Sequence, residues 1–344
     1  MIKNKEIKQI FYELSSTEQE KILEDLLQER ELKGEVQKQA AIEIQKSRNK
    51  KPCPHCKCDK THKRGFQNKL QMYVCTECKK WYNETTGTPL HGIHLKIKWQ
   101  SYLKCMEQGM AIKSIAKELK ISIQTSFDWR HKILSSLSSL VPEKLEGKVE
   151  CDELELALNE KGSHRLKRKA RKRGSDSNRN KDTGSLNVVQ VVTAIERGSK
   201  KSMYFRVAET KRLSELDVKK ALDGKLNPGT TLITDKHSAY RAFSKSNKDI
   251  THHTLKASDH VDKNNKNIHL QTVNNTHFRL RKFLTPFNGV STKYLQNYLN
   301  WFAYSSKLRE HKAILRQWFI TILMTDTSYS LFELFKENAV NIRT

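Results

Sequence analysis

Lys148-Val-Glu-Cys-Asp-Glu-Leu-Glu-Leu-Ala-Leu158 is the stretch of sequence that decides the fold of this chain. Its composition and the turn residues around it predict a first β-strand. Further strands are predicted at 186–195 and 203–208, with a turn between them at Arg197-Gly198. A helix at 213–222 and a fourth strand at 230–234, which ends at Asp235, complete the pattern.

Three consecutive strands, then a helix and a parallel strand, is the order of a ribonuclease-H-like α/β domain. In that arrangement the first and fourth strands lie side by side, so we expect Asp152 and Asp235 to meet. Two carboxylates at that junction repel each other unless a cation lies between them. Magnesium is expected there, with manganese as a substitute, because it is a hard ion that takes oxygen ligands. The alternative is that both aspartates are structural caps or turn residues.

The third ligand of such a site usually comes from a later helix and is usually acidic. No acidic residue occurs between Asp262 and Glu310. The predicted helix at 270–283 offers Asn274, Asn275 and His277 instead. The carbonyl oxygen of Asn274 can coordinate magnesium, although it adds no charge. Arg281 lies two turns along roughly the same face and could hold a phosphate.

Two Cys-x-x-Cys pairs lie upstream of this region, with eighteen residues between them. The pairs are Cys53-Pro-His-Cys56 and Cys75-Thr-Glu-Cys78. This spacing is typical of a zinc ribbon, in which each pair supplies two thiolates to a tetrahedral zinc ion. Because so small a ribbon has too little core to fold unaided, the zinc is expected to be structural.

Residues 110–134 have the layout of a helix-turn-helix, with Ser122 as the cap of the second helix. The second helix would present polar side chains to a DNA groove or its phosphates. These are Gln124, Thr125, Asp128, Arg130 and His131. The alternative is a three-helix arrangement that makes no contact with DNA.

The chain is strongly basic, since 64 Lys and Arg residues against 38 Asp and Glu residues give a formal charge of +26. Such a surplus attracts polyanions, and nucleic acid is the expected partner. From Lys161 to Lys181, ten Lys or Arg residues accompany only Asp176. In this basic insertion at 159–183, phosphate contacts are expected from Lys167, Arg168, Arg171 and Lys172. A solvated, disordered linker is the alternative.

No segment of the sequence is apolar enough to span or anchor in a membrane, and the N-terminus carries no apolar signal core. The seven cysteines are not arranged as a disulfide framework. The sequence therefore predicts a cytoplasmic protein without a membrane partner.

Several motifs occur together: Asp152-Glu, Ile233-Thr-Asp235, Val273-Asn274-x-x-His277-x-Arg-Leu-Arg281 and the run from Phe287 to Phe302. In this combination they resemble the bacterial insertion-sequence transposases of the "fifteen-ninety-five" group. The ribbon and the Thr86-Gly-Thr-Pro-Leu90 that follows it look like the N-terminal module of the same group. The resemblance covers roughly residues 50–305, and it implies a bacterial, nucleoid-associated protein.

The resemblance implies an Asp, Asp, Asn/Glu/His triad on a ribonuclease-H-like fold, followed by a Lys. Asp152, Asp235 and Asn274 match the triad, and Arg281 stands where the Lys is expected, with the same charge but a different geometry. It also implies a transposase that binds terminal inverted repeats and target double-stranded DNA as a homo-oligomer, and that cleaves and transfers strands with metal ions. The alternative is a catalytically inactive or domesticated DNA-binding protein, or a transcription regulator.

The predicted organisation is a multidomain α/β chain with five parts. They are a helical arm at 1–48, the zinc ribbon at 49–90, the helix-turn-helix at 95–140, the catalytic domain at 146–310 and a helical tail at 311–344.

Overall fold

The computed structural model describes residues 10–15, 18–19, 22, 52–67, 70–83, 85–87, 91, 98–163, 188–198, 202–208, 212–256, 259 and 261–308. Most of the predicted arm, the basic residues Lys167, Arg168, Arg171 and Lys172, and the predicted tail lie outside these ranges. The chain divides into two compact units, and the boundary between them falls after Lys104. Each unit is considered by itself.

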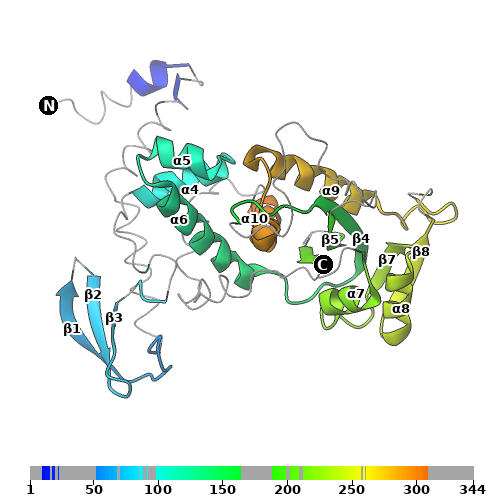
Figure 1. The fold of residues 1–344 in the computed structure, drawn as a ribbon, viewed down its shortest axis with the longest axis horizontal. Coiled ribbons are helices and arrows are strands. Elements are labelled where there is room, and N and C mark those ends of the chain that lie inside the picture. Colours follow the sequence, from blue (N-terminus) through cyan, green and yellow to red (C-terminus); the bar gives the residue numbers. More distant parts are fainter. Residues whose placement is uncertain are drawn as a thin grey trace. The chain divides into compact units, whose positions relative to one another are not determined.

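The described part of the first unit contains a small antiparallel sheet in the order β1-β2-β3 (Figure 1). Its strands are β1 (Thr61–Gln67), β2 (Leu70–Cys75) and β3 (Trp81–Asn83). β2 ends at Cys75, the first thiolate of the second Cys-x-x-Cys pair. The sheet has few buried apolar residues: Tyr73 and Tyr82 stack with ring centres 5.3 Å apart, next to Cys53 and Cys75. So small a core leaves much of the stability of this sheet to the cysteine cluster beside it.

The second unit is built around a five-stranded sheet in the order β6-β5-β4-β7-β8. The strands are β4 (Lys148–Ala157), β5 (Val188–Glu196), β6 (Met203–Val207), β7 (Thr231–Asp235) and β8 (Thr251–Leu255). β4, β5 and β6 pair antiparallel, whereas β7 runs parallel to both β4 and β8. The mixed α/β class and the adjacency of the first and fourth strands are therefore confirmed. β8 was not predicted.

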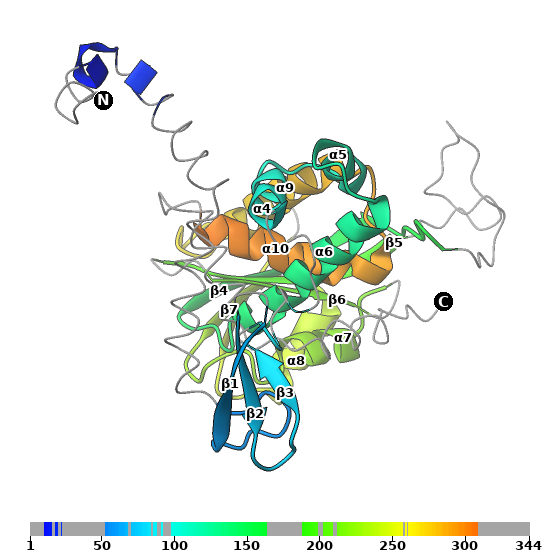
Figure 2. The same cartoon turned by 90° about the vertical axis from the view of Figure 1, so that its left-hand side faces the viewer.

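Helices cover both faces of this sheet (Figure 2). Val149 and Cys151 of β4 pack toward α7 and α8, whereas Leu154 packs toward α9 and α10. This division follows from the alternation of side chains along a strand. The helices are α7 (Glu215–Leu222), α8 (Ser238–Ser246), α9 (Gln271–Leu284) and α10 (Leu295–Leu308). Asp152 shares the strand parity of Leu154 and so belongs to the face that carries α9.

The remaining described helices precede the large sheet or connect its covering helices. They are α4 (Trp99–Glu107), α5 (Ile112–Glu118), α6 (Ile123–Ser136) and the short 3₁₀ helices η2 (Leu137–Leu140), η3 (Thr285–Phe287) and η4 (Thr292–Tyr294). The predicted cap of α6 is confirmed, since the Ser122 hydroxyl accepts a 2.9 Å hydrogen bond from the backbone N–H of Thr125. Among the described residues, none of the helices combines the length and apolarity needed to cross a bilayer.

Candidate functional site

Three carboxylates meet where β4 loses its parallel partner. Asp152 and Glu153 of β4 and Asp235 at the end of β7 each place one carboxylate oxygen within 4.8 Å of the others. The register pairs Glu150 with Ile233, so Asp152 and Asp235 lie equally far beyond that pair. β4 continues along β5 past the end of β7, and beyond Glu150 no described strand pairs with it on the β7 side.

The negative charges of the three carboxylates in this cluster repel one another. Burial, and then the charges of Glu153 and Asp235, raise the pKa of Asp152 to about 7. Burial and the Asp235 charge also raise the pKa of Glu153. One oxygen of Glu153, Oε2, is buried without a hydrogen-bond partner among the described residues. A divalent cation would offset the repulsion that raises these pKa values, and it would give Oε2 of Glu153 a partner. The all-oxygen donor set fits magnesium or manganese.

Local hydrogen bonds hold Asp235 in place. Its Oδ1 accepts a 2.9 Å bond from the backbone N–H of His237, which is the cap of α8. This turn is typical of an aspartate that ends a strand and begins a helix. One carboxylate oxygen of Asp235 is thus fixed by the chain.

Helix α9 brings an imidazole to the same place. Nδ1 of His277 lies 3.8 Å from Oδ2 of Asp152, which is too long for a direct hydrogen bond. Burial, and then the charge of Arg281, lower the pKa of His277 to about 4. The imidazole is therefore neutral at physiological pH, so it does not neutralise the carboxylates.

Residues 144–306 match the family described as the ISXO2-like transposase domain. This segment is an ISXO2-like transposase domain. The resemblance to insertion-sequence transposases is thereby confirmed, and the matched segment contains the whole carboxylate cluster. The chain is also 25% identical, over 260 residues, to an uncharacterized protein in transposable element ISH50 of Halobacterium salinarum. That similarity covers 74% of this chain and 85% of the relative.

Within the transposase domain, Asn274 is exposed on α9. Asn274, His277 and Arg281 follow one another at intervals of three and four residues, which places them on one face of the helix. Nη2 of Arg281 lies 3.4 Å from the carbonyl oxygen of Glu155 on β4, so this face is directed at β4. The assignment of Asn274 as a metal ligand and of Arg281 as a catalytic residue stays a prediction.

Glu153 is the member of the cluster that sequence interpretation missed. Alternation along β4 directs Asp152 and Glu153 to opposite faces, which argues against a shared site. The two side chains nevertheless converge, because no described strand pairs with β4 on the β7 side at this point. The acidic pair itself was the available signal, since acidic and apolar residues alternate along β4 on both sides of it and Asp152-Glu153 breaks the alternation.

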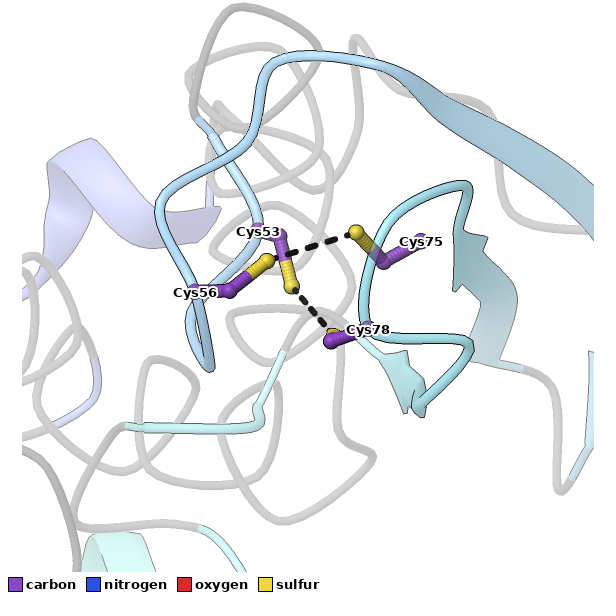
Figure 3. Close-up of side chains that lie close together, drawn as sticks. All are labelled: Cys53, Cys56, Cys75 and Cys78. Atoms are coloured by element: carbon purple, nitrogen blue, oxygen red, sulfur yellow. Dashed lines mark hydrogen bonds between the residues drawn. The ribbon is translucent and has the colours of Figure 1, made fainter.

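The four predicted thiolates form a second cluster, in the unit that contains the small sheet (Figure 3). The Sγ atoms of Cys53 and Cys78 lie 3.8 Å apart, and those of Cys56 and Cys75 lie 3.5 Å apart. A tetrahedral zinc ion with bonds of about 2.3 Å requires sulfur atoms about 3.8 Å apart. Burial opposes the thiolate of Cys75, yet backbone N–H groups of Cys78 and Glu77 lower its pKa to about 6. The cluster therefore fits a thiolate-binding metal ion.

Part of the polar set predicted on α6 is accessible. Gln124 is exposed, and its Nε2 donates a 2.9 Å hydrogen bond to Oδ1 of Asp128. Thr125 is half-buried at the beginning of the helix, next to the capping Ser122. Contact between these residues and DNA stays a prediction.

The other part of that set is buried. Arg130 is 0% exposed, and its guanidinium donates a 2.6 Å hydrogen bond to the carbonyl oxygen of Met110. The same guanidinium packs over the rings of Phe287 and Trp301. His131 is buried as well. This burial contradicts the expectation that Arg130 and His131 face a DNA groove, because apolar rings from α10 and η3 occupy the surface on which they were expected.

Proposed function

We propose that this chain is the transposase of an insertion sequence, which binds the terminal inverted repeats of its element and catalyses metal-dependent DNA cleavage and strand transfer. The convergence of Asp152, Glu153 and Asp235 within the transposase domain carries this proposal. A sheet in which three antiparallel strands are followed by two parallel ones supports a ribonuclease-H-like fold for the domain.

In this proposal Asp152, Asp235 and the carbonyl oxygen of Asn274 hold magnesium, and Glu153 supplies the negative charge that Asn274 lacks. These residues would hold the metal, which would supply activation of the attacking water or 3′-hydroxyl and charge stabilisation of the leaving oxygen of the phosphodiester. The neutral imidazole of His277 leaves the charge of Asp152 available to the cation. Arg281, on the same face of α9, would hold a non-bridging phosphate oxygen of the DNA.

The N-terminal half of the chain would hold the element's ends. We assign zinc to the thiolate cluster of Cys53, Cys56, Cys75 and Cys78, where it would stabilise the small sheet. Gln124 and Thr125, at the exposed beginning of α6, would contact base edges or phosphates. The basic insertion, through Lys167, Arg168, Arg171 and Lys172, would add sequence-independent contacts to the phosphate backbone.

Strand transfer requires both ends of an element to reach a catalytic site together, so we infer a homo-oligomer on DNA. The decisive experiment is incubation of purified, zinc-loaded protein with a duplex that carries a terminal repeat, with and without magnesium. Nicks at the element's ends that depend on magnesium would support the proposal. Binding of the repeat without cleavage at any magnesium or manganese concentration would indicate an inactive or domesticated DNA-binding protein instead.

A further inference from the structure

Glu150 is a buried carboxylate beside the proposed metal site, and it takes no part in the cluster itself. It lies two residues before Asp152 on β4, and its side chain is 0% exposed. A buried carboxylate is costly unless hydrogen bonds and opposite charges compensate for its lost hydration. The contacts that compensate for Glu150 all come from segments that position α9.

The first contact is with the beginning of α9. Oε2 of Glu150 accepts a 2.9 Å hydrogen bond from the backbone N–H of Val273, in the first turn of the helix. First-turn N–H groups have no partner within a helix and are normally capped by a side chain. The cap position of α9 is occupied by Leu270, whose side chain makes no such bond. Glu150 therefore caps α9 from a neighbouring strand, where the positive end of the helix dipole favours its charge.

The second set of contacts holds the loop that leads into α9. Oε1 of Glu150 lies 3.4 Å from Nε of Arg197 and 3.1 Å from Nδ1 of His269. Nη1 of Arg197 also donates a 2.6 Å hydrogen bond to the carbonyl oxygen of Asn267. Arg197 follows the end of β5, so it fastens the loop to the sheet through Glu150.

We propose that Glu150 is a positioning residue, which sets the distance between the metal ligands on β4 and those on α9. Asp152 stands two residues after Glu150 on the same face of the strand, and Asn274 directly follows Val273. One side chain thus joins the two segments next to both ligands. This inference rests on the proposed function, because it takes Asn274 to be a ligand. Groups that orient metal ligands typically contribute 10-fold to 100-fold to metal affinity.

The test compares zinc-loaded, full-length Glu150→Ala protein with wild type by calorimetric titration with Mn²⁺ alone and by amide hydrogen exchange of α9. Glu150→Ala should weaken Mn²⁺ binding about 10-fold to 100-fold and accelerate exchange at the beginning of α9. Glu150→Gln retains an acceptor for the Val273 N–H, so it should fall between the two. Ser214→Ala removes the cap of α7 on the opposite face of the sheet and should leave both measurements unchanged.

Unchanged Mn²⁺ affinity in Glu150→Ala, together with unchanged exchange of α9, would overturn the inference. If Glu150→Ala does not fold, Arg197→Ala is compared with wild type by the same two measurements. This variant releases the loop that leads into α9 and keeps the cap that Glu150 provides. If the wild type does not bind Mn²⁺, the proposed function fails, and faster exchange of α9 in the variants would then support Glu150 as an anchor of the helix alone and overturn its role toward a metal.

Discussion

The guanidinium of Arg130 lies 5.4 Å from the ring centre of Trp301, which joins helix α6 to helix α10 of the transposase domain. Phe287 lies at 5.5 Å from the same guanidinium, so the cation packs against two rings. The exposed beginning of α6 is therefore attached to the transposase domain through its buried second half. If Gln124 contacts a terminal repeat, the bound DNA end cannot move relative to the carboxylate cluster unless the packing of Arg130 against the two rings is broken.

Arg130 is accordingly predicted to act through stability and not through DNA contact. Arg130→Ala should lower the free energy of unfolding by about 2 kcal/mol or more, because it removes a charged hydrogen bond and two ring contacts from the interior. Gln124→Ala should change stability by no more than about 0.5 kcal/mol, since the residue is exposed. Denaturant unfolding measures both. Wild-type stability in Arg130→Ala, with weaker binding of DNA, would restore the groove interpretation.

Asp152 and Asp235 are predicted to be essential for cleavage and dispensable for binding. Asp152→Ala and Asp235→Ala each remove an oxygen from the cluster and should abolish nicking of terminal-repeat DNA. Binding of the repeat, measured by fluorescence anisotropy, should remain close to wild type, because recognition is assigned to other residues. Asp223→Asn is a suitable control, since this exposed aspartate lies after α7. Nicking by either alanine variant would place the active site elsewhere.

Asn274 gives a sharper test of the ligand set. Asn274→Ala should be inactive, whereas Asn274→Asp should retain activity because it supplies an oxygen at the same reach and adds a negative charge. Wild-type cleavage by Asn274→Ala would mean that the third ligand is another residue. Glu153 already lies in the cluster, and Asp259 and Asp262 are the acidic residues nearest to α9 in the preceding sequence. Asp262 is a weak candidate, since its Oδ1 accepts hydrogen bonds from the backbone N–H groups of Asn264 and Asn265.

The sheet and its metal ligands were predictable to different degrees. Strand order places Asp152 beside Asp235, because local patterns and the rules of parallel connection are sufficient for that. The burial of Arg130 was not predictable, since Phe287 and Trp301 come from a distant part of the sequence. The role of Glu150 was hidden for the same reason: its partners lie on α9 and in the loop before it. When distant segments bury a polar residue, the local hydrophobic pattern of the sequence carries no sign of it.

Zinc is predicted to be required for the small sheet. Cys53→Ser should reduce the zinc content and unfold β1 to β3, because three thiolates close a tetrahedral site less well than four. Cys58→Ser is the matched control: its sulfur accepts a hydrogen bond from the backbone N–H of Lys60 and lies outside the cluster. The Cys58→Ser protein should retain one zinc ion per chain, as measured by elemental analysis. Wild-type protein purified without chelator that contains no zinc would exclude this assignment.

His131 is predicted to make the stability of the folded chain depend on pH. Burial, and then the charge of Arg130, lower the pKa of His131 to about 3, well below the value of about 6.5 in an unfolded chain. Between these values the unfolded state binds a proton that the folded state does not. The contribution is therefore fully present above about pH 6.5, and it is lost as the pH falls, at up to about 1.4 kcal/mol per pH unit. His277, whose pKa is lowered to about 4, acts in the same direction.

The test therefore compares the pH dependence of stability in wild type with that in His131→Phe, which keeps a ring against Phe127 and Tyr294. Denaturant unfolding between about pH 4.5 and about pH 7.5, the span in which histidines of the unfolded chain titrate, should give a shallower dependence of stability on pH for His131→Phe. Equal slopes for the two proteins would show that His131 has the same pKa in the folded and unfolded states, which would require a different environment around α6.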